Sequence, residues 1–85
     1  VLAYLAVGGR IEGVEFLLDR GAEINTRTGF GETPLMLASS LGNVEMVRLL
    51  LSRGADISQK DTVGRTALHS ACQAGSTPMI RILLE

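Results

Sequence analysis

The stretch 21–24, which reads Gly-Ala-Glu-Ile, returns at 54–57 as Gly-Ala-Asp-Ile, so the second copy begins 33 residues after the first. A more degenerate copy precedes both, with Gly9 at the position of Gly42. The same offset relates further pairs: Gly31 and Gly64, Thr33 and Thr66, Leu35 and Leu68, Gly42 and Gly75, Arg48 and Arg81, Leu51 and Leu84. A fixed period of this length is typical of stacked supersecondary units, each of which buries its apolar face only against its neighbours.

The composition is that of a small folded domain with an aliphatic core. The chain has 85 residues, of which 46% are hydrophobic and only 4% aromatic, so we expect a core of Leu, Ile, Val, Ala and Met. The formal net charge is −1, with basic and acidic residues interspersed. That pattern argues against nucleic acid and membrane surfaces as partners. The longest apolar stretches are too short to span a bilayer.

Residues 34–41 are predicted to form the first helix of the second copy. Thr33 and Pro34 are typical of a helix start, because Thr caps the first turn and Pro lacks an amide that would have no partner within the helix. Gly42 can adopt the left-handed backbone that ends a helix. The chain can then reverse its direction immediately after this helix.

A second helix is predicted at 44–53, with Asn43 as its cap and Gly54 at its end. Its apolar residues recur at three- and four-residue spacing, as in an amphipathic helix. Helices of eight to ten residues are too short to persist alone in water. Each helix pair must therefore be stabilised by the next pair in the stack.

The segments between the helix pairs, 22–31 and 55–64, are polar and contain glycines. Each ends in a predicted β-turn with Gly31 or Gly64 at its last position. Because both segments are too short for another helix, we expect them to project as extended fingers.

The chain resembles the ankyrin-repeat family over essentially its whole length. The resemblance rests on the 33-residue period and on the following motifs: Thr33-Pro34-Leu35, Thr66-Ala67-Leu68-His69, the turns at Gly42 and Gly75, the Leu-Leu-Leu and Ile-Leu-Leu helix ends, and the Gly-Ala-Asp-Ile segment. It implies an all-α solenoid of antiparallel helix pairs with hairpin-like fingers. It also implies a truncated first repeat at 1–21, a second at 22–54 and a third at 55–85, within a longer array.

The chain departs from the family pattern at several positions. His69 matches the family's helix-start histidine, but Met36 and Ala3 stand at the aligned positions. Arg10 replaces the capping residues Asn43 and Ser76. We expect lower cohesion between repeats, and the first repeat to be the weakest unit.

His69 and Cys72 are the chain's only histidine and only cysteine, three residues apart on one predicted helix. A Cys-His nucleophile needs the two within hydrogen-bond reach, together with an orienting group and an oxyanion hole. The repeat explains both residues instead. His69 stands at the family's structural histidine, and Cys72 aligns with Ser39 and Ala6, where we expect a small buried residue.

Two carboxylate pairs are possible acid-base or cation sites: Glu12 with Glu15, and Asp56 with Asp61. The first pair is expected on an outer helix face and the second in an exposed finger, so solvated surface is favoured for both. We therefore predict no catalytic, metal or cofactor site, and no enzyme activity.

The resemblance implies a protein partner bound by the finger tips and the inner helices. The residues expected to contact it are Phe30, Glu32, Val63, Arg65, Leu41 and Gln73. Interface hot spots are enriched in aromatic residues and arginine, which favours Phe30 and Arg65 as anchors. The alternative for Phe30 is stacking on Val63 or on a neighbouring finger. Arg27 and Lys60 are either solvated or steer an acidic partner.

Two functions fit these features: a protein-binding scaffold, or a regulatory or substrate-recruiting segment of a larger enzyme or ion channel. A lone cysteine fits a reducing, intracellular location, either cytoplasmic or nuclear. Apolar residues at both ends of the stack predict that the isolated chain is weakly stable or self-associates.

Overall fold

A computed structural model describes residues 2–84, and within that range the chain forms six helices and no strand. The helices are α1 (Leu2–Val7), α2 (Ile11–Asp19), α3 (Pro34–Leu41), α4 (Val44–Ser52), α5 (Ala67–Ala74) and α6 (Thr77–Leu84). The predicted helix at 34–41 is confirmed. The helix predicted at 44–53 ends one residue earlier, because Arg53 is its C-cap.

The helix termini follow the capping residues of the sequence. The hydroxyl of Thr33 accepts a hydrogen bond from the Met36 amide at 3.3 Å, and the side chain of Asn43 accepts one from the Met46 amide at 3.1 Å. Gly42 ends α3 with a φ of +73°, a conformation that costs other residues energy. At the N-terminus of α2, Arg10 supplies no side-chain cap, as expected.

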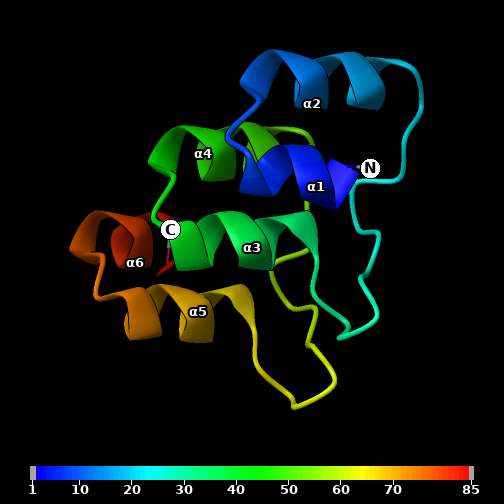
Figure 1. The fold of residues 1–85 in the computed structure, drawn as a ribbon. Coiled ribbons are helices and arrows are strands. Elements are labelled where there is room, and N and C mark those ends of the chain that lie inside the picture. The colour runs from blue at the N-terminus through cyan, green and yellow to red at the C-terminus, as the bar shows by residue number, and fades with distance from the viewer. Residues whose placement is uncertain (1, 85) are drawn as a thin grey trace.

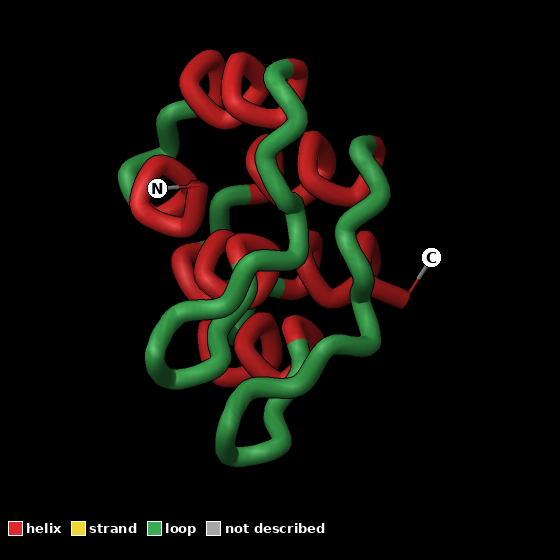
Figure 2. The backbone as a smooth tube through the Cα atoms, turned by 90° about the vertical axis from the view of Figure 1, so that its right-hand side faces the viewer, coloured by secondary structure: helices red, strands yellow, loops and turns green. Residues whose placement is uncertain are grey.

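The six helices form two layers. Helices α1, α3 and α5 lie side by side in one layer, and α2, α4 and α6 form the other, with each helix pair antiparallel (Figure 1). The loops between successive pairs project from the α1–α3–α5 layer, one beside the other (Figure 2). This is the serial stack with fingers that the period predicts.

The core runs along the interface between the two layers. Its largest fully buried side chains include Leu35 from α3, Met46 and Leu50 from α4, and Met79 from α6. The middle pair is buried most completely because it has a neighbouring pair on each side. Of the apolar residues at the ends of the stack, Leu2 and Leu83 are buried, whereas Val7 and Leu84 are exposed.

The expectation that Cys72 is buried is wrong. Ser39 and Ala6 occupy the same repeat position and are fully buried, but Cys72 is exposed. Helices α1 and α3 each pack against the inner-layer helix of the following pair, whereas no pair follows α5 and α6 in the described chain. Burial there is decided by the neighbour and not by the period.

Candidate functional site

The two finger loops, 22–31 and 55–64, end in the β-turns that the sequence predicts. In the first finger the Gly31 amide donates to the Thr28 carbonyl at 2.8 Å, and in the second the Gly64 amide donates to the Asp61 carbonyl at 3.0 Å. Both glycines have positive φ, +76° and +85°. The turns place Phe30 and Val63 at equivalent positions in the two tips.

Each finger is closed by one side chain that binds two backbone amides. In the first, the Thr28 hydroxyl accepts from the amides of Phe30 and Glu32 at 3.2 and 3.3 Å. In the second, an Asp61 carboxylate oxygen accepts from the amides of Val63 and Arg65, both at 2.9 Å. A hydroxyl and a carboxylate thus perform the same structural task one period apart.

The residue after each turn complements the closing side chain. The Thr28 hydroxyl donates to the Glu32 carboxylate at 3.4 Å, whereas Arg65 Nε donates to the Asp61 carboxylate at 3.1 Å. The Asp61 side chain is only 6% exposed and that of Arg65 is 45% exposed. The hydrogen bond from the Arg65 amide is the main cause that lowers the pKa of Asp61, aided by the Val63 amide and the Arg65 guanidinium against the opposing effect of desolvation.

The fingers are also bonded to each other. The Phe30 carbonyl accepts from both the amide and the hydroxyl of Thr62, at 3.1 and 3.0 Å. The Arg27 guanidinium donates to the Lys60 carbonyl, and its Nε donates to the Gly31 carbonyl at 3.2 Å. Arg27 is therefore neither a simple solvated charge nor a free steering charge, because it ties the first finger to the second.

A further link lies closer to the helices. The Asn25 side chain accepts from the Asp56 amide at 2.9 Å. The Asp56 carboxylate binds the amide and hydroxyl of Ser58 and the amide group of Gln59. The Ser58 hydroxyl is the main cause that lowers the pKa of Asp56. Asp56 and Asp61 bond different residues of the same finger and share no hydrogen-bond partner.

The tip residues are exposed as a predicted binding surface requires. Phe30 is 75% exposed and Val63 is 73% exposed, so little of either side chain is covered by the rest of the chain. This exposure favours a binding surface over the alternative in which Phe30 stacks on Val63 or on a neighbouring finger. Glu32 is half-buried and Arg65 is exposed beside the second tip.

Leu41 and Gln73 are exposed but lie away from the tips. Leu41 lies at the C-terminal end of α3 and Gln73 at that of α5, whereas each finger leads into the N-terminal end of its helix. An eight-residue helix is about 12 Å long, so the predicted contacts fall into two groups. One group surrounds the tips and the other lies at the far edge of the α3–α5 face.

The structure does not assemble a nucleophile from His69 and Cys72. His69 Nδ1 lies 3.1 Å from both the amide and the hydroxyl of Thr66, where it accepts from the amide and closes a capping box at the start of α5. Among the hydrogen bonds of residues 2–84, none joins His69 to Cys72. Glu12 and Glu15 are exposed, and the described residues contain no group of three or more potential metal ligands.

Sequence reasoning missed the closing side chains Thr28 and Asp61 and the links made by Asn25 and Arg27. A signal for the first two was present, because Asp, Asn, Ser and Thr at the start of a turn commonly bond the amide two residues later. The links between fingers had no comparable local signal.

Comparison with known proteins agrees with this architecture. Residues 2–85 match the family described as ankyrin repeats (3 copies), and no individual curated protein matches the chain. No helix in the described range is long and apolar enough to cross a membrane. Ankyrin repeats are non-catalytic and generally serve as protein–protein interaction modules. With three stacked helix pairs, projecting fingers and a match that spans nearly every residue, this chain belongs to the ankyrin-repeat family.

Proposed function

We propose that this chain binds a partner protein through the tips of its two fingers, with Phe30 and Val63 as apolar anchors and Glu32 and Arg65 beside them. The observation that carries the proposal is the exposure of two apolar tips on loops that are fixed by internal hydrogen bonds. Leu41 and Gln73 extend the contact surface along the inner helices toward its far edge.

The fixed loops favour tight binding. Loop ordering on association costs free energy, and a surface that is already ordered avoids most of that cost. Thr28, Asp61 and Thr62 hold the fingers through bonds made entirely within the chain. A partner therefore meets anchors that are already in position.

Arg65 can serve both the finger and the partner. Only its Nε bonds to Asp61, and a guanidinium has further N–H donors. The terminal nitrogens are thus available to a carboxylate or carbonyl of the partner, while the ion pair restricts where they can point.

The test replaces Phe30 with a photo-crosslinking amino acid in cells that produce the protein, with the same replacement at Phe16 as the matched control. Phe16 is also an exposed aromatic residue, but it lies on α2. We expect a protein to be crosslinked from position 30 and not from position 16. For that protein, Phe30→Ala with Arg65→Ala should weaken binding by about 2 kcal/mol or more. An unchanged affinity with an intact far-UV circular dichroism spectrum would move the interface elsewhere.

We also propose a longer repeat array, an intracellular location and self-association of the chain. The exposure of Cys72, at a position that is buried in the two preceding pairs, supports a longer array in which another repeat covers α5. The family and the single thiol support an intracellular location, cytoplasmic or nuclear. The exposed Val7 and Leu84 support self-association of the chain when neighbouring repeats are absent.

A further inference from the structure

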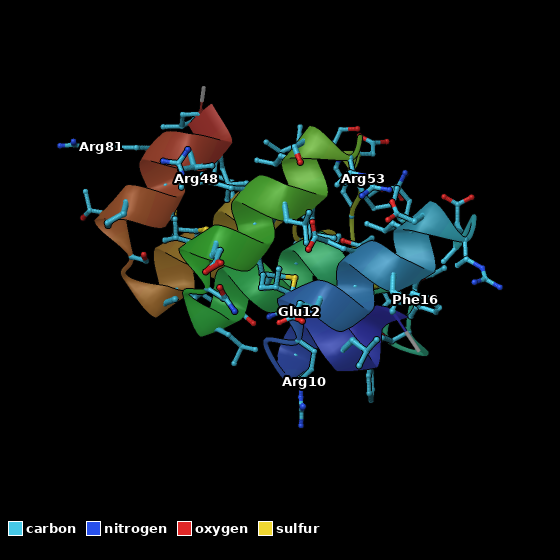
Figure 3. The ribbon with its side chains drawn as sticks, turned by 90° about the horizontal axis from the view of Figure 1, so that it is seen from above. Arg10, Glu12, Phe16, Arg48, Arg53 and Arg81 are labelled. Atoms are coloured by element: carbon cyan, nitrogen blue, oxygen red, sulfur yellow. The ribbon has the colours of Figure 1, made fainter. Side chains whose placement is uncertain are left out.

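An open groove runs between α4 and α6, in the layer opposite the fingers. It has a volume of about 540 Å³ and is lined by Val44, Arg48, Thr77, Pro78, Arg81 and Ile82. Figure 3 shows Arg48 and Arg81 on this side of the molecule, on neighbouring helices. The fingers extend from the other layer (Figure 1), so the groove is separate from the surface proposed above.

Arg48 and Arg81 stand one period apart, at equivalent positions of α4 and α6. Both are exposed. Within residues 2–84 neither forms an ion pair nor donates a side-chain hydrogen bond. Both residues line the groove, the Arg81 side chain extends outward from α6 (Figure 3), and neither has an anionic partner in the described chain.

Four of the other five arginines have partners within the described residues, and the fifth, Arg10, lies outside the groove. Arg53 pairs with Asp19 at 2.6 Å, Arg65 pairs with Asp61, and Arg20 lies 5.2 Å above the Phe16 ring. Arg27 bonds two carbonyls between the fingers. The groove is thus lined by two arginines that have no structural task comparable to these.

The rest of the lining is largely apolar. Val44 is half-buried, Ile82 is buried and Pro78 is exposed beside them. A ligand that fits both parts carries negative charges at two points and an apolar group between them. Nucleic acid fits less well, because it needs a longer basic stripe, and the chain has only eight basic residues against nine acidic ones.

We propose that this groove binds an acidic peptide segment of a second protein, with one carboxylate on Arg48, another on Arg81, and an apolar side chain between them over Val44 and Pro78. Neighbouring packed helices are about 8–10 Å apart, and an extended peptide rises about 3.3 Å per residue. Carboxylates three residues apart therefore match the spacing expected between equivalent positions of two neighbouring helices. Guanidinium groups bind carboxylates in a two-pronged geometry that also sets the direction of the peptide.

The test measures binding of a fluorescent peptide that has glutamates three residues apart with a leucine between them, by fluorescence anisotropy. We expect saturable binding by the unmodified protein that weakens as salt is added. The same peptide with glutamine in place of glutamate should not bind. Absence of saturable binding by the glutamate peptide would overturn the proposal.

Matched protein variants distinguish binding in the groove from attraction by the overall charge of the protein. Arg48→Gln with Arg81→Gln should weaken binding about tenfold, as expected for the loss of two exposed ion pairs. Arg10→Gln with Lys60→Gln removes the same charge elsewhere and should change the affinity less than about twofold. Equal losses in the two double variants would show nonspecific attraction and overturn the proposal. Thermal unfolding of each variant verifies that the fold is retained.

Two further outcomes are distinguished. Arg48→Lys with Arg81→Lys keeps the charge but loses the two-pronged geometry, and we expect an intermediate affinity. If sedimentation shows that the groove mediates contact between two copies of this chain, and the peptide does not compete, the occupant is a second copy and the proposal is wrong. Phe30→Ala should leave peptide binding unchanged, so this test is independent of the finger surface.

Discussion

Asp61 occupies in the second finger the place that Thr28 occupies in the first, and each accepts hydrogen bonds from the amides two and four residues later. The residues that follow the turns have changed accordingly. A hydroxyl that can donate faces Glu32, and a carboxylate that can only accept faces Arg65. The two fingers thus use complementary pairs of opposite polarity to close the same loop.

This exchange predicts a strong coupling between positions 28 and 32. Thr28→Asp alone places a carboxylate against Glu32 and should destabilise the protein by about 0.5–1 kcal/mol, since like charges at close range repel. Adding Glu32→Arg recreates the pair of the second finger and should recover most of that loss. Urea unfolding of both single variants and the double variant measures the coupling, and strictly additive effects would contradict it.

The second finger should lose stability in acid. The folded-state pKa of Asp61 lies below its ordinary value of 3.8, so its stabilising contribution is complete above that value and is lost as the pH falls through the folded pKa. Asp56 acts in the same direction. We expect Asp61→Asn to reduce the fall in melting temperature between neutral pH and pH 2, whereas Glu15→Gln on the outer face of α2 should not. Parallel curves for Asp61→Asn and the unmodified protein would exclude this role.

The two turn glycines should differ in their tolerance of alanine. Both have positive φ, which costs a residue with a Cβ about 1–2 kcal/mol. A Cβ on Gly31 would lie 2.9 Å from the Thr62 amide nitrogen, but one on Gly64 would meet no atom within 4 Å. Gly31→Ala should therefore be the more damaging by at least about 1 kcal/mol. The free energies of urea unfolding check this, and equal losses would mean that the close approach of the fingers is unimportant.

A residue that caps the N-terminus of α2 should increase the stability of the protein. Arg10 provides no cap, whereas Asn43 caps α4 at the equivalent position. Arg10→Asn should stabilise the protein by about 0.5–1 kcal/mol, and Asn43→Ala should destabilise it by about 1 kcal/mol. Thermal unfolding measures both. A neutral Arg10→Asn would show that unfolding of this end of the stack is not coupled to the rest.

Core truncation should be severe in the middle pair. Leu50 is fully buried, whereas Leu41 is exposed. Leu50→Ala should cost about 2–5 kcal/mol, and Leu41→Ala less than about 0.5 kcal/mol. Circular dichroism during urea unfolding compares them. A mild effect of Leu50→Ala would indicate that the outer helices carry little of the stability.

The fold was predictable because its determinants are local and repeated. Thr33, Gly42 and Asn43 set helix ends through contacts within four residues, and the period repeats these signals. The burial of Cys72 was predicted wrongly, because it depends on whether another helix pair follows. The sequence period does not tell whether another helix pair covers α5.

The site was predictable only at the level of the loops. The exposure of Phe30 and Val63 follows from their position in polar turns between helix pairs. The bonds from Thr62 to Phe30 and from Arg27 to Lys60 join residues about one period apart, and they depend on how closely two loops approach in space. Whether the tips bind a partner stays a prediction.

The double hydrogen bond from Thr62 to the Phe30 carbonyl makes the direction of the first tip depend on a residue of the next repeat. If the tips bind a partner as proposed, substitutions of Thr62 should therefore change the affinity through the position of Phe30. In a selection for tighter binding, we expect substitutions at Thr62 as well as at Phe30.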